Sequence, residues 1–297
     1  MDHLSFLKSL PAETRNSLVK KSDRIGGFHL IVHWGLILVN GSLIALRVPY
    51  WPALIPIQSA LIIFTFATLH ETVHRTAFRS IWLNELVGRV AGLLVGVPYS
   101  WFRYYHFTHH KYTNDPSRDP ELAAGGRPEN TRSYLWQITG LPAWYGQLKI
   151  LVRVGLAGTF EEFIPPNARI RVRVEILLML IIYIVTLLYS FTTSTVFLTI
   201  WIVPLVLGQP LLRLFLLAEH GRCPTEQDMF ANSRTIYTNR LMRFLSWNMP
   251  YHAAHHAYPS VPFHALPRLN QLLRHHLKAT SDGYVAFHKE YISNIRR

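Results

Sequence analysis

The sequence predicts an all-α integral membrane protein in which four transmembrane helices carry a cytoplasmic helical cap with a histidine-rich di-metal site. Three observations indicate this fold class. Hydrophobic residues make up 49 % of the 297 residues and charged residues only 16 %, below the roughly 25 % that is usual in soluble domains. The apolar residues are concentrated in long runs, as in membrane spans. Several of the 16 histidines are grouped in short segments near the ends of these runs.

Four apolar runs are predicted to cross the membrane, because about 20 apolar residues rising ~1.5 Å each span the hydrocarbon core. The first run is about 28–48, after which several prolines turn the chain. The second run, about 53–69, ends directly before a histidine pair. The third and fourth runs, about 176–191 and 196–217, are joined by a short polar turn.

The remaining segments are expected to form the cap, in residues 70–172 and 218–297 of a single domain covering 1–297. Residues 86–101 are apolar but contain an arginine, three glycines and a proline, which predicts an interfacial or re-entrant piece. Residues 113–133 have a loop composition. Residues 141–160 are amphipathic and are expected either on the membrane surface or packed against the cap.

The distribution of basic residues predicts the orientation. Lys and Arg number 5 in residues 1–28, 12 in 71–172 and 10 in 221–297, whereas the two turns between paired spans contain none. By the positive-inside rule, both termini and the large middle segment are cytoplasmic. The net charge of +13 favours anionic lipid headgroups or an acidic protein as partners. No basic module with interleaved aromatics is present, so nucleic acid is not expected.

Nine histidines in four motifs form the candidate metal site. The motifs are HETVH, HFTHH, HAAHH and AEHG, and the spacings of three and four place each group on one helix face. Imidazole suits iron, zinc and copper, and nine ligands exceed the four that one zinc takes. Two metals with redox chemistry on oxygen are therefore predicted. The candidate ligands are His70, His74, His106, His109, His110, His220, His252, His255 and His256.

These motifs resemble the membrane-bound fatty acid desaturases and their hydroxylase relatives. The resemblance runs from about His70 to Leu269 and is carried by HETVHRTAF, FRYYHFTHHKYTNDPSRDPEL and NMPYHAAHHAYPSVPFHALPRL. It implies two iron ions held by the nine histidines, oxygen as oxidant and an acyl chain as substrate. In some family members an asparagine in the place of Asn248 meets a metal through water, so Asn248 is a weaker candidate.

Metal-bound imidazoles need partners for their second ring nitrogen. Four acidic residues near the motifs are candidates for this role or are simply surface charges: Glu71, Asp115, Asp119 and Glu219. The resemblance also implies an external electron donor of ferredoxin or cytochrome b5 type. The single cysteine, Cys223, excludes a protein-held iron–sulfur cluster, and no polar stretch is left over for a haem domain.

Oxygen-dependent desaturation of an acyl chain or acyl lipid is the function that this pattern favours. Hydroxylase, ketolase and alkene-forming decarboxylase activities remain open, because the histidine pattern does not separate them. HETVH also matches the HExxH motif of zinc proteases, with Glu71 as the base, but that activity would leave two motifs unexplained. A metal transporter would place its ligands inside the spans rather than beyond them. The pair His29 and His33 is expected to be structural.

Overall fold

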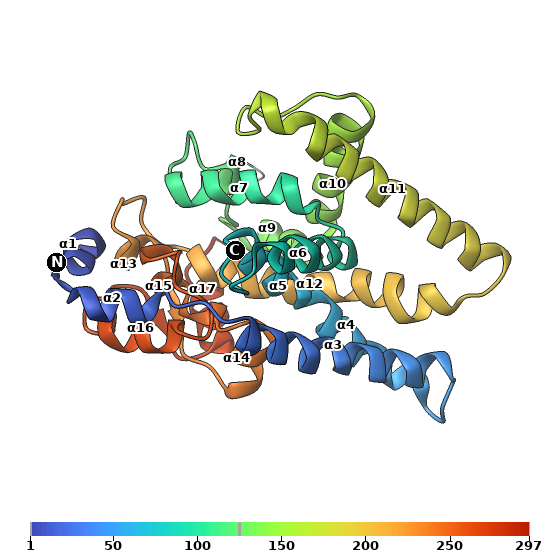
Figure 1. Ribbon diagram of the computed structural model, residues 1–297, viewed down its shortest axis with the longest axis horizontal. Coiled ribbons are helices and arrows are strands. Elements are labelled where there is room, and N and C mark those ends of the chain that lie inside the picture. Colours follow the sequence, from blue (N-terminus) through green and yellow to red (C-terminus); the bar gives the residue numbers. More distant parts are fainter. Residues whose placement is uncertain (1, 124–125, 297) are drawn as a thin grey trace.

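The computed structural model describes residues 2–123 and 126–296, and most of these residues are helical (Figure 1). The first half contains α1 His3–Ser9, α2 Ala12–Leu18, α3 Asp23–Ala45, α4 Ile55–Ile63, α5 Thr65–Val73, α6 Ile81–Val95, α7 Tyr99–Tyr112, α8 Pro120–Ala123, α9 Thr131–Ile138 and α10 Leu141–Ile150. The second half contains α11 Arg169–Thr192, α12 Val203–His220, α13 Met229–Asn232, α14 Arg240–Leu245, α15 His252–Ala257, α16 Leu266–Leu273 and α17 Tyr284–Ser293.

Short irregular helical segments join or extend these helices. Three are 3-10 turns at Trp51–Leu54, Pro166–Ala168 and Met249–Tyr251, and two are π-helical, at Leu151–Leu156 and Leu198–Ile202. Two strands of two residues each, β1 Thr235–Ile236 and β2 Thr280–Ser281, pair in parallel. The predicted all-α class is therefore confirmed for the described residues.

Four helical segments in the described ranges are long and apolar enough to cross a membrane, as predicted: Ala12–Ala45, Trp51–Val73, Pro166–Thr192 and Leu198–His220. Their bounds differ from the predicted runs because a helix continues through polar residues that hydropathy alone leaves out. The third segment begins ten residues before the predicted position 176, with three arginines in its first turns. The fourth ends at His220 itself rather than at 217.

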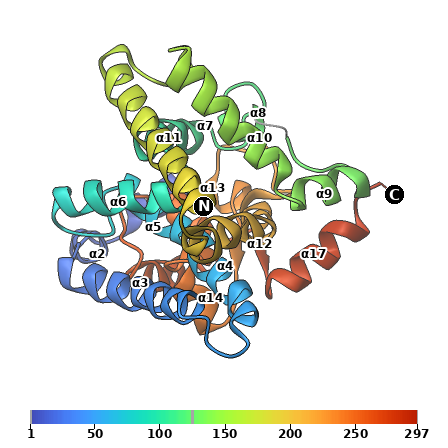
Figure 2. The same ribbon diagram turned by 90° about the vertical axis from the view of Figure 1, so that its right-hand side faces the viewer.

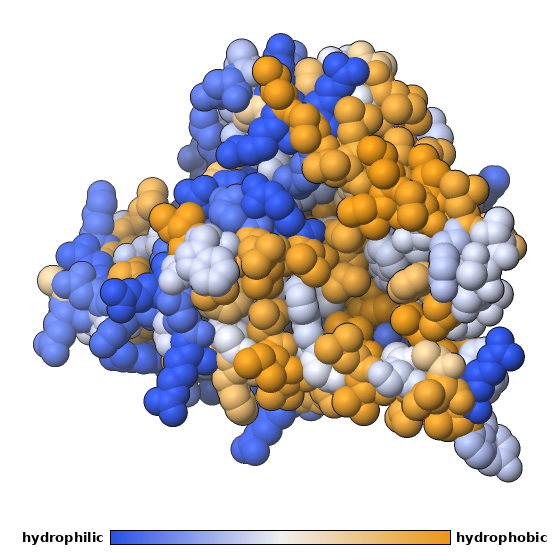
Figure 3. All heavy atoms as spheres, turned by 45° about the vertical axis from the view of Figure 1, so that its right-hand side comes forward, coloured by the Kyte–Doolittle hydropathy of each residue, from blue (hydrophilic) through white to orange (hydrophobic). Residues whose placement is uncertain are grey.

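The outer faces of these segments are apolar. On α11 alone, Ile170, Leu178, Ile181, Val185 and Leu188 are all more than half exposed. Figure 3 shows hydrophobic side chains gathered over the side that these segments form, while hydrophilic side chains gather at the opposite end of the molecule. Seen end-on in Figure 2, α4 lies among the neighbouring spans and packs against α3 and α12. An apolar surface of this extent is stable only in contact with lipid.

The stretch 86–101 forms the corner between α6 and α7, whose axes meet at 95°. Gly96 makes this corner with a φ of +75°, a conformation that side chains disfavour, and Pro98 directly precedes α7. The re-entrant or interfacial geometry predicted here thus corresponds to a sharply broken helix pair. The break directs α7 back over the ends of the spans, toward α5 (Figure 1).

The pair His29 and His33 has a structural role, as expected. His29 Nε2 lies 2.9 Å from the carbonyl oxygen of Phe244, and His33 Nε2 lies 3.0 Å from that of Leu61. These bonds tie α3 to α4 and to α14. Neither ring belongs to the histidine groups described below.

Candidate metal centre

Four helices bring the nine histidines together. The end of α5 carries His70 and His74, and the last residue of α12 is His220. The last turns of α7 carry three further histidines, and the short helix α15 carries the remaining three. At Gly221, α12 stops, and a side chain there would overlap the Leu217 carbonyl oxygen. Helices α5 and α12 thus deliver their histidines at their ends, where α7 and α15 meet them.

The nine rings form two groups, and within each group one nitrogen per ring lies within 4.8 Å of the others. The five-histidine group consists of His70, His74, His106, His110 and His255. The four-histidine group consists of His109, His220, His252 and His256. Seven of the nine side chains are buried and two, His74 and His110, are half-buried.

Helix geometry explains the division. Residues four apart lie on one helix face, whereas neighbouring residues point about 100° apart. Consequently, His106 and His110 enter the five-histidine group while His109 enters the other. On α15, His252 and His256 likewise share a group, and His255 joins the other one.

In the five-histidine group, several ring nitrogens face one another. Nε2 of His106 lies 2.9 Å from Nε2 of His74 and 3.0 Å from Nε2 of His110, which in turn lies 3.1 Å from Nε2 of His255. Both nitrogens of His70 are buried without a hydrogen-bond partner in the described part of the chain. A neutral imidazole has only one N–H group. The three contacts between Nε2 atoms therefore cannot all be hydrogen bonds, and some of these atoms face each other as lone pairs.

In the four-histidine group, each ring turns its Nδ1 toward an oxygen atom. Asp119 Oδ1 lies 2.9 Å from His109 Nδ1, and the carbonyl oxygen of Asn232 lies 3.0 Å from His220 Nδ1. Glu219 Oε1 lies 3.3 Å from His252 Nδ1, and the Thr113 hydroxyl lies 3.2 Å from His256 Nδ1. For His109, His220 and His256 these acceptors place the ring proton on Nδ1 and leave Nε2 as a lone pair. Glu219 lies near His252 Nδ1 but makes no hydrogen bond to it.

These lone pairs then point at one another. His220 Nε2 lies 3.2 Å from His109 Nε2 and 2.9 Å from His252 Nε2. Facing lone pairs at such distances repel unless a cation lies among them. The donor set therefore fits a metal ion in each group, with four or five imidazoles as ligands.

Burial favours the ligand form of the α15 histidines. It lowers the pKa of His252, His255 and His256 well below the usual value, with further lowering from neighbouring histidines. Each imidazole is therefore neutral near pH 7, and a neutral ring is the form that binds metal.

Of the four acidic candidates, two lie where a ring N–H needs an acceptor: Asp119 and Glu219. Glu71 is fully buried but instead accepts from the Thr76 hydroxyl (2.9 Å) and the Phe263 amide (3.2 Å), linking the HETVH motif to the loop after α15. Asp115 binds Ser117 and Arg118 in an exposed turn. No hydrogen bond or ion pair joins Glu71 or Asp115 to a histidine ring in the described part of the chain.

Asn248 adopts a left-handed backbone conformation (φ 60°) before α15, and its side-chain amide donates to the Phe263 carbonyl oxygen at 3.1 Å.

Three partners of the histidine rings were not predicted from the sequence. Glu121 Oε2 lies 3.1 Å from His109 Nδ1, and Thr113 and Asn232 were described above. Thr113 directly follows α7 and contacts the ring of His256, which is 143 residues away in the sequence, so local spacing gave no signal for it. Asn232 acts through its backbone, which sequence does not reveal.

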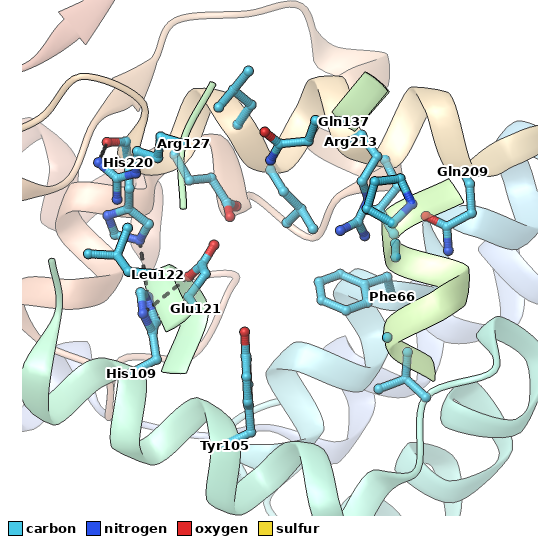
Figure 4. Close-up of a pocket in the computed structure, with 18 of the residues that line it drawn as sticks. Phe66, Tyr105, His109, Glu121, Leu122, Arg127, Gln137, Gln209, Arg213 and His220 are labelled. Atoms are coloured by element: carbon cyan, nitrogen blue, oxygen red, sulfur yellow. Dashed lines mark hydrogen bonds and ion pairs between the residues drawn. The ribbon is translucent and has the colours of Figure 1, made fainter. Parts of the chain in front are cut away.

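A cavity of about 410 Å³ opens beside both groups (Figure 4). His109, His220, Glu121 and Arg127 lie at one side of the view, and Phe66, Gln209 and Arg213 lie at the other. Aromatic and aliphatic side chains form much of the wall, among them Phe66, Val97, Trp101, Phe102, Tyr105, Ile150 and Leu212.

Comparison with known proteins adds a family assignment. The model of the fatty acid desaturase family matches residues 45–288. The chain belongs to this family. It is 26 % identical over 213 residues to human sphingolipid delta(4)-desaturase DES1, and 27 % identical over 220 residues to mouse sphingolipid delta(4)-desaturase/C4-monooxygenase DES2. Each alignment covers 69 % of this chain, and the chain spans 59 % of the length of these relatives.

Proposed function

We propose that the chain is an oxidoreductase that uses two histidine-bound iron ions and oxygen to desaturate the hydrocarbon chain of a lipid. The observation that carries this proposal is the pair of buried histidine groups beside a largely apolar cavity. Membership of the fatty acid desaturase family supports it. Iron would supply the oxygen chemistry needed to break an unactivated C–H bond, which no side chain is basic enough to deprotonate.

The chain's own residues prepare this site. Nine imidazoles would hold the two ions, the five-histidine group one and the four-histidine group the other. Asp119, Glu219, Thr113 and the Asn232 carbonyl orient the rings of the four-histidine group, a role that commonly contributes 10- to 100-fold to metal affinity. Trp101, Phe102 and Phe66 form an apolar wall that would hold the hydrocarbon chain and exclude water.

Hydroxylation is the second candidate activity. One relative is named both desaturase and C4-monooxygenase, so the two outcomes occur on similar chains. Peptide hydrolysis is disfavoured by the position of Glu71, because a general base must reach the metal-bound water, whereas this carboxylate binds Thr76 and Phe263.

We further propose that the metal centre and both termini face the cytoplasm, and that the whole described chain acts as one domain. The distribution of Lys and Arg supports this orientation. Electrons would come from a separate acidic donor of ferredoxin or cytochrome b5 type. The excess of 30 basic over 17 acidic residues would attract such a partner.

The proposal is tested by metal analysis and lipid profiling. Purified protein should hold close to two iron ions per chain. Cells that express it should contain an unsaturated or hydroxylated lipid that disappears with His106→Ala, whereas His275→Ala, outside both groups, should keep the product. One tightly held zinc with peptidase activity that is lost in Glu71→Gln would overturn the proposal.

A further inference from the structure

The metal centre has an outward side that the cavity does not reach. Among its nine histidines, only His74 and His110 are half-buried, and neither lines the cavity. Both belong to the five-histidine group, which therefore comes nearer to the surface than the four-histidine group. The histidines that do line the cavity are His70, His106, His109, His220 and His252. A lipid and a second reactant can thus approach the centre from different sides.

On the outward side, an exposed aromatic ring lies against one of these ligands. Phe107 is 38 % exposed, and its ring centroid lies 5.5 Å from that of His74. Arg103, Phe107 and Lys111 are four residues apart on α7, so they form a stripe along one helix face, the α7 stripe. The guanidinium carbon of Arg103 lies 4.4 Å from the centroid of the Phe107 ring. Helix α7 ends on the side of the molecule where hydrophilic side chains gather (Figure 1 and Figure 3).

The α7 stripe carries positive charge that the chain does not neutralise. No Asp or Glu of the described ranges lies within 4.0 Å of the charged groups of Arg103 or Lys111. Arg103 Nη1 is also shielded from solvent without a hydrogen-bond partner among those residues. Glu85, on the neighbouring helix α6, already pairs with Arg75 at 2.8 Å. Carboxylates on a partner would supply what the stripe lacks, and its aromatic ring and arginine are of the types enriched in protein interfaces.

We propose that the α7 stripe is the docking surface of an acidic one-electron carrier protein, and that electrons enter the centre at the five-histidine group through His74. This inference rests on the proposed function, because it locates the electron supply that this function requires. A carrier seated on Phe107 comes within one aromatic ring of a metal ligand, and electron transfer slows steeply with distance. Transient electron-transfer complexes commonly bury less than about 1,200 Å², so a short stripe is sufficient.

The electron balance requires two dockings per turnover. Reduction of O2 to two water molecules takes four electrons and four protons. Removing two hydrogen atoms from adjacent carbons of the lipid supplies two electrons and two protons and leaves a C=C bond. Two carriers, each oxidised by one electron, supply the other two electrons, and solvent supplies the other two protons. The carriers can exchange on the outward side while the lipid stays in the cavity.

The test measures binding, so the result does not depend on turnover. Purified, iron-containing protein in detergent is titrated with fluorescently labelled plant-type ferredoxin and, separately, with the soluble haem domain of cytochrome b5. At least one probe should bind, and Lys111→Glu should weaken its binding about 2- to 10-fold at low salt, because an exposed ion pair becomes a repulsion. This difference should vanish at high salt, where surface charges are screened. Phe107→Ala should weaken binding about 5-fold or more at either salt concentration, because a central aromatic contact is lost.

The matched control is Lys289→Glu, the same charge change at an exposed lysine on α17, and it should bind the carrier as the unaltered protein does. Carbodiimide cross-linking gives a second readout, because it joins a lysine to a carboxylate only where the two groups touch. Mass spectrometry should find the new amide bond at Lys111. Cross-links confined to other lysines, equal binding by Lys111→Glu and Lys289→Glu, or no binding of either probe would overturn the docking surface.

Anionic lipid headgroups are the alternative occupant of the α7 stripe. If Lys111→Glu binds the carrier normally but loses co-purifying anionic lipid, the stripe faces the membrane surface and the proposal is wrong. Lipid profiling separates this failure from a failure of the proposed function. With the carrier in excess, Lys111→Glu and Phe107→Ala should still form the oxidised lipid. Oxidised lipid together with unaltered carrier binding overturns only the docking surface, whereas no oxidised lipid from the unaltered protein overturns the proposed function.

Discussion

Asp119 is the most informative single position for testing how the metal centre is held. Its side chain is 1 % exposed and accepts three N–H groups, from His109 Nδ1 at 2.9 Å, the Asn114 amide at 2.8 Å and the Glu121 amide at 2.9 Å. Asp119→Asn keeps the size of the side chain but replaces one accepting oxygen by a donating amide. His109 Nδ1 then faces a neutral side chain in place of a carboxylate, and one of the three N–H groups faces a donor.

The expected cost follows from the charge lost beside His109 and from the one lost hydrogen bond. Hydrogen bonds to a charged group are worth about 1.5–3 kcal/mol, and removing the partner of a metal-bound histidine lowers metal affinity by roughly 10- to 100-fold. Glu121 Oε2 lies 3.1 Å from His109 Nδ1 and should partly compensate for the change at Asp119. The double variant Asp119→Asn with Glu121→Gln should therefore lose more affinity than either single variant.

The assay measures iron retained per chain after equilibration with increasing chelator, in purified protein shown to be folded by size exclusion. The matched control is Asp115→Asn, in the same loop, because Asp115 binds only Ser117 and Arg118 among the described side chains. We expect iron to leave Asp119→Asn at a lower chelator concentration than the control. Equal retention by the two variants would refute the orienting role of Asp119.

Three further predictions concern stability and electron supply. Glu71→Leu removes the acceptor of the buried Phe263 amide, so the free energy of unfolding should fall by about 1–3 kcal/mol. Thermal unfolding in detergent should show a smaller loss of stability for Glu71→Gln, because glutamine keeps an accepting oxygen. Gly26→Ala should destabilise the protein by about 1–3 kcal/mol, because the new methyl would overlap the Ala77 carbonyl oxygen. Gly27→Ala meets no atom within 4 Å and should be neutral or stabilising in the same measurement, and equal effects at both glycines would contradict this packing. Turnover with limiting acidic electron donor should fall as salt rises, since screening acts over about 8 Å at physiological ionic strength, while iron content stays constant; salt-independent turnover, or turnover without any reductant, would contradict an electrostatically docked donor.

The sequence was sufficient to predict the four spans and the nine clustered histidines. Long apolar runs have few alternatives to a membrane helix, because backbone polar groups in lipid must be satisfied within the segment. Histidines four apart on a helix must share a face, so pairs such as His106 with His110 and His252 with His256 were bound to stay together. Span bounds were less predictable, since α11 continues through the arginines that precede its apolar run.

Only the tertiary structure decided which histidines meet across helices and what supports them. His109 and His110 are neighbours in sequence yet belong to different groups, because they point apart around α7 and meet different rings of α15. Asp119 and Asp115 are equivalent candidates in sequence, but the loop turns one toward His109 and the other toward Arg118. Arg213 is an unexplained charge in an apolar run until α9 and α10 place glutamines around the same cavity. Such contacts depend on how separate helices pack, and a one-dimensional pattern records only the face that each helix offers.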